Sequence, residues 1–168
     1  DANGAWPLDT ALQALRRMPA ALIEQPVATP DIDALLDRCP PRPRRPAIAV
    51  DESCASPAQA AALIERGRID ALVIKPCTLG GLLPALATIE KACAAGIHVI
   101  LSNLMESAIG RTGVAHLAAA LPQLPGPHGL ATGAWFARDL AADRIERGEL
   151  LLHGGPGLGF NPGEDLHV

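Results

Sequence analysis

Short, nearly continuous apolar runs alternate along the chain with longer segments in which apolar residues recur at helical spacing. Runs of the first kind are typical of strands in a parallel sheet that is covered on both faces. They occupy residues 20–24, 47–50, 71–74 and 98–101, and His128–Thr132 is expected to add a last strand. This alternation predicts an α/β fold built from repeated βα units.

Helices are predicted between the strands, over residues 7–18, 31–38, 56–66, 78–95, 107–121 and 134–147. Ser56 followed by Pro57 is a typical helix start, and Gly67 is a typical helix end. Pro84 either kinks its helix or marks the true start of that helix. The proline-rich segment 40–46 is expected to form a loop between a helix and a strand.

Polar residues stand at the ends of the expected strands, with spacings of 23, 27, 24 and 27 residues between Asp1, Glu24, Asp51, Lys75 and Ser102. A repeat of about 25 residues is the length of one βα unit in a barrel. An open doubly wound sheet accepts the same pattern, but these strand-end residues favour the barrel. We therefore predict one domain over residues 1–168, a partial (β/α)-barrel with about six of the eight βα units.

Composition narrows the function classes. The chain has 168 residues, 49% of them hydrophobic, so a packed core is expected. The net charge of −4 is spread over interspersed acids and bases, which argues against a nucleic-acid partner. Neither a membrane span nor a signal peptide is recognisable, so a cytoplasmic location without membrane contact is expected. The four cysteines form no C-x-x-C pair and are expected to be free thiols.

The strand-end acids Asp1, Glu24 and Asp51 predict a metal site. Three carboxylates at one mouth of a barrel repel one another unless a cation lies between them. Hard oxygen ligands suit Mg²⁺, which keeps other positions for water or substrate. A single strand-end acid is weaker support, because aspartate also caps helices.

Lys75 follows a fully apolar strand. It either extends to solvent at a barrel rim or serves as a cation that carries a proton or stabilises an anionic intermediate. The next loop, Ser102–Ser107, offers hydroxyls, an amide and backbone N–H groups at a helix N-terminus, which suit a substrate carboxylate. Capping of the helix by Ser102 or Asn103, with Glu106 near the first turn, is compatible with that role. The glycine-rich segment 154–159 lacks the ending of a phosphate loop.

Five motifs resemble the enolase superfamily, in its muconate-lactonising-enzyme-like branch. They begin at Asp1 (DANGAW), Glu24 (EQP), Asp51 (DES), Ile74 (IKP) and Ser102 (SNLMESAIG), in the order of that family. Within the branch, the last two motifs are most similar to the o-succinylbenzoate synthases of menaquinone biosynthesis.

The resemblance implies a reaction. A divalent metal held by Asp1, Glu24 and Asp51 would bind the carboxylate of a small-molecule substrate, an enediolate would form, and water would leave by β-elimination. Lys75 would face the enediolate as a catalytic cation. The resemblance also places Ser102, Asn103 and Glu106 near the substrate and makes Asn3 a residue that orients Asp1.

The chain departs from the family pattern at its start. The family's Lys-x-Lys motif would precede Asp1, and so would its N-terminal capping domain. We therefore expect a fragment that is inactive alone, of unknown oligomeric state. Alternatives within the superfamily are N-succinylamino-acid racemase, dipeptide epimerase and muconate cycloisomerase, whereas a non-catalytic barrel remnant is an alternative of another class. A doubly wound nucleotide-binding domain is disfavoured because no glycine-rich turn follows a strand.

Overall fold

The computed structural model describes residues 1–159, and residues 160–168 of the predicted domain lie outside the described part. The described residues divide into two compact units. The first comprises Asp1–Ile74 and Ala87–Val99, and the second comprises Lys75–Leu86 and the chain from Ile100 onward. The prediction of a single domain stays a prediction.

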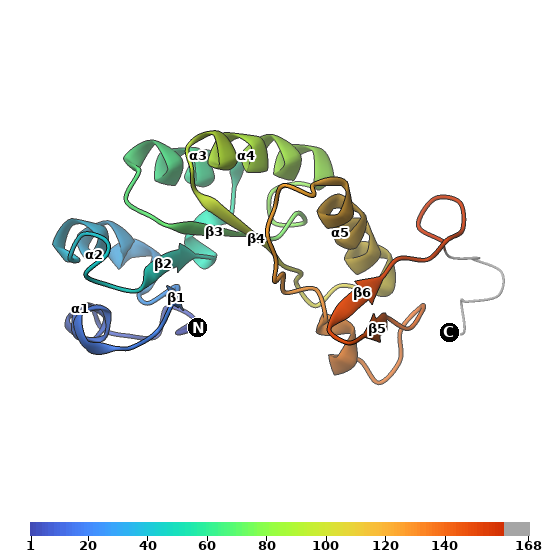
Figure 1. The fold of residues 1–168 in the computed structure, drawn as a ribbon, viewed down its shortest axis with the longest axis horizontal. Helices are drawn as coiled ribbons and strands as arrows, with labels where there is room; N and C mark the ends of the chain where they lie inside the picture. Colours follow the sequence, from blue (N-terminus) through green and yellow to red (C-terminus); the bar gives the residue numbers. More distant parts are fainter. Residues whose placement is uncertain (160–168) are drawn as a thin grey trace. The chain divides into compact units, whose positions relative to one another are not determined.

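Four strands form one sheet in the order β1-β2-β3-β4, namely β1 (Leu22–Glu24), β2 (Ala47–Val50), β3 (Ala71–Ile74) and β4 (His98–Leu101). β1 pairs with β2 and β2 pairs with β3, both in parallel. Figure 1 shows these strands as successive arrows, and along the chain a helix connects each strand to the next. The predicted α/β fold with a parallel sheet is confirmed, and the strand positions agree with the apolar runs.

Five α-helices lie among the described residues: α1 (Leu8–Arg17), α2 (Ile32–Arg38), α3 (Pro57–Arg66), α4 (Leu82–Ala94) and α5 (Ala108–Ala120). Short 3-10 turns stand at η1 (Thr29–Asp31), η2 (Glu52–Cys54) and η3 (Thr132–Trp135). The Ser56 hydroxyl accepts the Gln59 N–H at the start of α3, and Gly67 ends that helix at a φ of 66°. Pro84 lies in the first turn of α4, so it marks the start of the helix and not a kink.

The core of the first unit explains why α1 and α2 form. Leu12 and Leu15 of α1 and Leu35 and Leu36 of α2 are fully or almost fully buried, as is Ile48 of β2. α1 and α2 pack on each other, and Figure 1 shows both beside β1 and β2. Burial of these apolar side chains stabilises helices that are short for independent folding.

The predicted helix over residues 134–147 is wrong. Those residues begin in η3, continue as a loop and enter a separate antiparallel hairpin of β5 (Arg144–Glu146) and β6 (Glu149–Leu151). Arg147 and Gly148, at φ of 54° and 84°, form the tight hairpin turn. None of the apolar residues of this segment is buried, and Trp135 and Ile145 are 80% and 45% exposed, so little apolar burial holds a helix in place.

The last predicted strand is reduced to one bridge. Within His128–Thr132, Gly129 makes an isolated parallel bridge with Ser102. The described residues therefore form four of the strands expected of the barrel, with this bridge at the place of the next one. The number of βα units in the barrel stays a prediction. None of the described helices is both long and apolar enough to span a membrane.

Candidate functional site

The predicted metal ligands Glu24 and Asp51 lie at the carboxyl ends of neighbouring strands. β1 and β2 are paired so that Glu24 stands opposite Ala49, and the Gln25 N–H donates to the Ala49 carbonyl at 2.9 Å. Asp51 directly follows β2 and is only 9% exposed, while Glu24 is half-buried. The parallel pairing thus brings both acids to the same edge of the sheet.

Asp1 reaches this edge through a tight turn. The Ala2 N–H donates to the Glu24 carbonyl at 3.0 Å, and the Gly4 N–H donates to the Gln25 carbonyl at 2.7 Å. Asn3 donates its backbone N–H to Asp1 Oδ1 at 2.8 Å and its side-chain amide to Oδ2 at 2.9 Å. Asn3 therefore holds both carboxylate oxygens of Asp1, each of which keeps a further lone pair.

Gln25 ties the ends of β1 and β2 together. Its side chain is fully buried. Its amide nitrogen donates to the Val27 carbonyl and to Ser53 Oγ, each at 2.8 Å. Its oxygen accepts the N–H groups of Asp51 at 3.0 Å and Ser53 at 3.3 Å. All four hydrogen-bonding positions of the amide are used, so Gln25 fixes the backbone on which Glu24 and Asp51 stand.

The donor chemistry of this edge fits a hard divalent cation, since all three side chains are carboxylates. Over residues 1–159, however, no three His, Cys, Asp or Glu side chains are close enough together to hold a metal ion. The structure brings Asp1, Glu24 and Asp51 to one edge on hydrogen-bonded backbone, without gathering their oxygens around one point.

The charge of this edge acts on a neighbouring thiol. Burial, together with the negative charge of Asp51, raises the pKa of Cys54 from 9.0 to about 11. The thiol is therefore protonated at neutral pH and unreactive. All four cysteines are free, as predicted.

In the second unit, Lys75 follows β3 and begins a turn that leads to α4. Its side chain is half-buried. Its carbonyl accepts the Thr78 hydroxyl at 2.8 Å and the Thr78 N–H at 3.0 Å. These bonds fix the backbone from which the ammonium group extends.

Ser102 and Asn103 contact the segment after α5. Ser102 Oγ donates to the Gly129 carbonyl and Asn103 Nδ2 donates to the Leu130 carbonyl, each at 3.3 Å. Asn103 is 4% exposed, and its Oδ1 has no hydrogen-bond donor within the described residues. A buried acceptor in that state is unfavourable unless water or a ligand donates to it.

Glu106 folds back over its own loop. Its Oε1 accepts the Leu104 N–H at 3.1 Å. A Cβ on Gly110 would collide with Glu106 Oε2, so this conformation of Glu106 requires glycine four residues later. Burial raises the pKa of the nearby Cys77, and the charge of Glu106 and a hydrogen bond to it add to that rise.

The N-terminus of α5 holds a carboxylate from the chain itself. Asp139 Oδ1 accepts the Ala108 N–H at 2.9 Å, while the side chain of Ser107 makes no capping hydrogen bond. The expectation that Ser102 or Asn103 caps this helix is wrong, because both side chains donate to Gly129 and Leu130 instead.

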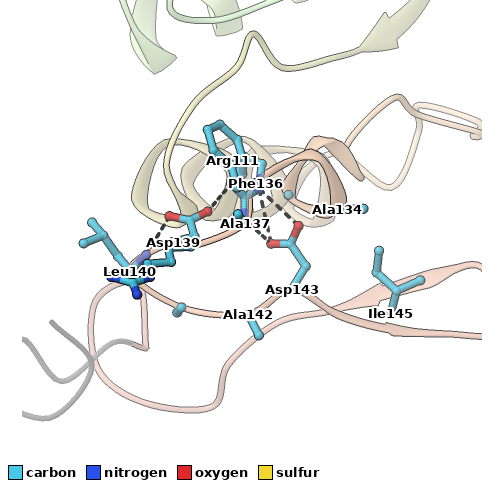
Figure 2. Close-up of a pocket in the computed structure, with 12 residues that line it drawn as sticks. Arg111, Ala134, Phe136, Ala137, Asp139, Leu140, Ala142, Asp143 and Ile145 are labelled. Carbon is cyan, nitrogen blue, oxygen red and sulfur yellow. Dashed lines mark hydrogen bonds and ion pairs between the residues drawn. The ribbon is translucent and has the colours of Figure 1, made fainter. Parts of the chain in front are cut away.

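Arg111 anchors the segment that was expected to be helical. Its guanidinium is 1% exposed and bonds to Asp139, to Asp143 at 2.8 Å and to the Glu106 carbonyl at 2.7 Å. It also lies over the Phe136 ring, 5.7 Å from its centre. Figure 2 shows the two aspartates on either side of Arg111. All three residues line a hollow of about 600 Å³.

The charges in this cluster stabilise one another. Burial opposes ionisation of Arg111, but hydrogen bonds and charges from Asp143 and Asp139 outweigh it and raise the pKa of Arg111. Burial likewise raises the pKa of Asp139, but donors from Ala108, Arg111 and Leu140 outweigh it and lower that pKa. Both groups are therefore charged at neutral pH.

Sequence reasoning missed Gln25 and Arg111 as organising residues. Gln25 stands in the middle of the EQP motif, and its place directly after an apolar strand is the sequence signal of a buried amide. Arg111 lies within a mostly apolar helical pattern, and a buried arginine there needs partners. Asp139 and Asp143 are those partners, but their spacing of four residues also fits a helix.

Comparison with known proteins identifies the family. Residues 1–166 match the family described as enolase C-terminal domain-like. The chain is 35% identical to a chloromuconate cycloisomerase of Pseudomonas putida over 96% of its length, which is 44% of that protein. It is 36% identical to an o-succinylbenzoate synthase of Mycobacterium ulcerans over 86% of its length, or 43% of that protein.

Solved structures agree. The muconate cycloisomerase from Pseudomonas fluorescens superposes with a TM-score of 0.86 at 27% identity, covering 99% of this chain and 47% of that one. The L-Ala-D/L-Glu epimerase from Bacillus subtilis gives a TM-score of 0.83 at 27% identity, covering 95% and 45%. The chain thus spans less than half the length of these relatives. Its fold, its sequence and its strand-end motifs agree on one assignment, and the chain belongs to the enolase C-terminal domain-like family of the enolase superfamily.

Proposed function

We propose that the chain is the metal-binding part of an enolase-superfamily enzyme that removes the proton α to a carboxylate and eliminates water, as an o-succinylbenzoate synthase does. The observation that carries this proposal is the carboxyl edge of β1 and β2. There, Asp1, Glu24 and Asp51 are three acids on backbone that Asn3 and Gln25 hold by hydrogen bonds.

Asp1, Glu24 and Asp51 would bind one Mg²⁺ after their side chains turn toward one another. The bound cation would supply a Lewis acid that lowers the pKa of the C–H next to the substrate carboxylate. Asn3 would keep Asp1 oriented, since it holds both oxygens. Gln25 would limit movement of the Asp51 backbone and so keep the ligand spacing constant.

Four further residues of the family motifs are proposed to act on the substrate. Lys75 would stabilise the negative charge of the enediolate as a fixed cation. Asn103 would use its buried Oδ1 to accept a hydrogen bond from substrate or from an ordered water. Ser102 and Glu106 would complete the contacts to the substrate. These roles rest on the family motifs and on the local geometry of each residue.

A second reading within the superfamily is a cycloisomerase. It is supported by the chloromuconate cycloisomerase of Pseudomonas putida, whose identity of 35% is close to the 36% of the synthase. Both reactions would use the same metal ligands and differ in how the substrate is held. Epimerase or racemase activity is supported by the structural similarity to the Bacillus subtilis epimerase.

Product binding separates these readings. We would titrate the chain with o-succinylbenzoate and with muconolactone by calorimetry, each with and without Mg²⁺. The synthase proposal expects that o-succinylbenzoate binds more tightly than muconolactone and that Mg²⁺ strengthens its binding about tenfold or more, because the cation binds the carboxylate.

Asp51→Asn should remove the effect of Mg²⁺, whereas Asp31→Asn, which changes an acid on η1, should not. Preference for muconolactone would replace the synthase reading with the cycloisomerase reading. Binding of both products at equal strength with and without Mg²⁺ would contradict the metal-assisted mechanism.

A further inference from the structure

A hollow of about 470 Å³ lies in the first unit, beside the starts of β1 and β2. Five arginines line it: Arg16, Arg17, Arg42, Arg44 and Arg45. Its other lining residues are apolar, so no acid lines the hollow. The strand-end carboxylates stand at the opposite ends of the same strands, which makes this a separate feature.

Two of the five arginines are fixed in position. Arg45 is buried, and its guanidinium bonds to Asp70 and to the carbonyls of Pro40 at 2.9 Å and Pro46 at 2.8 Å. Arg42 Nη1 donates to the Arg45 carbonyl at 2.8 Å, and its Nε lies 3.7 Å from Asp70 Oδ1. One aspartate thus serves both arginines.

The other three arginines carry uncompensated charge. Arg16 and Arg17 come from the last turn of α1 and Arg44 comes from the proline-rich loop, and all three are exposed. Within residues 1–159 none of them forms an ion pair. In a chain of net charge −4, this gathering of guanidinium groups is a local excess of positive charge.

We propose that this hollow binds an anion with several phosphate groups, such as a short polyphosphate chain or the triphosphate of a nucleotide. Guanidinium groups form paired hydrogen bonds to phosphate oxygens. A single carboxylate would neutralise only one of the three unpaired arginines, whereas an oligophosphate carries enough charge for all of them. Pro41, Pro43 and Pro46 restrict the loop backbone, so less conformational freedom is lost on binding.

The test titrates the chain with tripolyphosphate and with ATP by calorimetry at low and high salt. The double variant Arg17→Gln with Arg44→Gln should weaken tripolyphosphate binding about tenfold or more, and added salt should weaken it in the unmodified chain. The matched control is Arg144→Gln with Arg147→Gln, which removes the same charge from exposed arginines of the β5–β6 hairpin and should leave binding unchanged.

Equal affinity for tripolyphosphate and ATP would show that the phosphate chain is recognised, and tighter binding of ATP would show that a nucleotide is the ligand. Thermal melting would confirm that each variant is folded. The proposal is overturned if tripolyphosphate does not bind at about 10 mM and low salt. It is also overturned if both double variants lose the same affinity, or if a poly-glutamate peptide binds where tripolyphosphate does not. The arginine variants keep Asp1, Glu24 and Asp51, so their Mg²⁺ binding should not change. A loss of tripolyphosphate binding alone therefore tests the arginine hollow and not the metal proposal.

Discussion

Two arginines in this protein each bind a pair of aspartates four residues apart, and their surroundings differ. Arg66, at the end of α3, pairs with Asp33 at 3.1 Å and Asp37 at 2.7 Å, whose side chains are 69% and 62% exposed. Arg111 pairs with Asp139 and Asp143, whose side chains are both 12% exposed. The first pair of acids lies on helix α2, whereas the second lies on a loop.

The comparison teaches that the same spacing of charges can serve two purposes. Asp33 and Asp37 stand on one face of a helix that its apolar residues already hold, so Arg66 adds little. Asp139 and Asp143 belong to a segment whose apolar side chains are not buried, and the buried Arg111 is what fixes that segment. A buried charge left without its partner is costly, whereas an exposed one is solvated by water.

The largest expected effect comes from Arg111→Met. It leaves two poorly solvated carboxylates near α5, and we expect the free energy of unfolding to fall by about 3–5 kcal/mol. Arg66→Met is the matched control and should lower it by no more than about 1 kcal/mol. Urea denaturation measures both. Similar losses in the two variants would contradict the role assigned to burial.

The next largest effect concerns Gln25, whose buried, uncharged side chain fixes the ends of β1 and β2 as Arg111 fixes the loop after α5. Gln25→Leu removes a buried amide that satisfies the N–H groups of Asp51 and Ser53, so we expect a loss of about 1–3 kcal/mol. Gln13→Leu, at an exposed position of α1, controls for the change of residue type. An unchanged urea midpoint for Gln25→Leu would show that the amide is not an organising residue.

A smaller effect distinguishes two glycines of α5. Alanine is favoured over glycine in a helix by about 1 kcal/mol. At Gly113 an added Cβ meets only Leu82 Cδ1 at 3.7 Å, so Gly113→Ala should be stabilising. Gly110→Ala should lose this gain because it displaces Glu106, and the thermal midpoints of the two variants should differ in that order. Equal stabilisation would show that Glu106 moves without cost.

The smallest expected effect is a decrease in the stabilisation by the Arg111–Asp139 pair as the pH is lowered. The pKa of Asp139 is lowered in the folded chain from its usual 3.8, so the unfolded chain binds the proton more readily. The stabilisation is complete above that usual value and is lost as pH falls through the lowered pKa. The difference in thermal midpoint between the unmodified chain and Asp139→Asn should therefore shrink on acidification below about pH 4. A difference that does not change with pH would contradict this assignment.

The sequence predicted the parts of the fold that follow from apolar periodicity. The four strands at residues 22–24, 47–50, 71–74 and 98–101 coincide with apolar runs, and Ser56 and Gly67 mark the ends of α3 as expected. The helix predicted over residues 134–147 is wrong because the apolar residues there fit a helical pattern but are not buried in the folded protein. Its conformation depends on Arg111, which is distant in sequence.

The candidate site was predictable only in outline. Successive strand ends and the motifs around them indicated Asp1, Glu24 and Asp51 together. The backbone bonds from Ala2 and Gly4 to the end of β1, and the amide of Gln25, depend on three-dimensional contacts that no spacing reveals. The roles of Lys75, Ser102, Asn103 and Glu106 stay predictions.

The most direct test of the proposed metal site is a calorimetric titration of the chain with Mg²⁺. We predict saturable binding of one Mg²⁺ that raises the thermal midpoint, with loss of both effects in Asp51→Asn and retention in Asp31→Asn. Binding that is absent in the unmodified chain, or equally strong in Asp51→Asn, would contradict the assignment of Asp1, Glu24 and Asp51 as metal ligands.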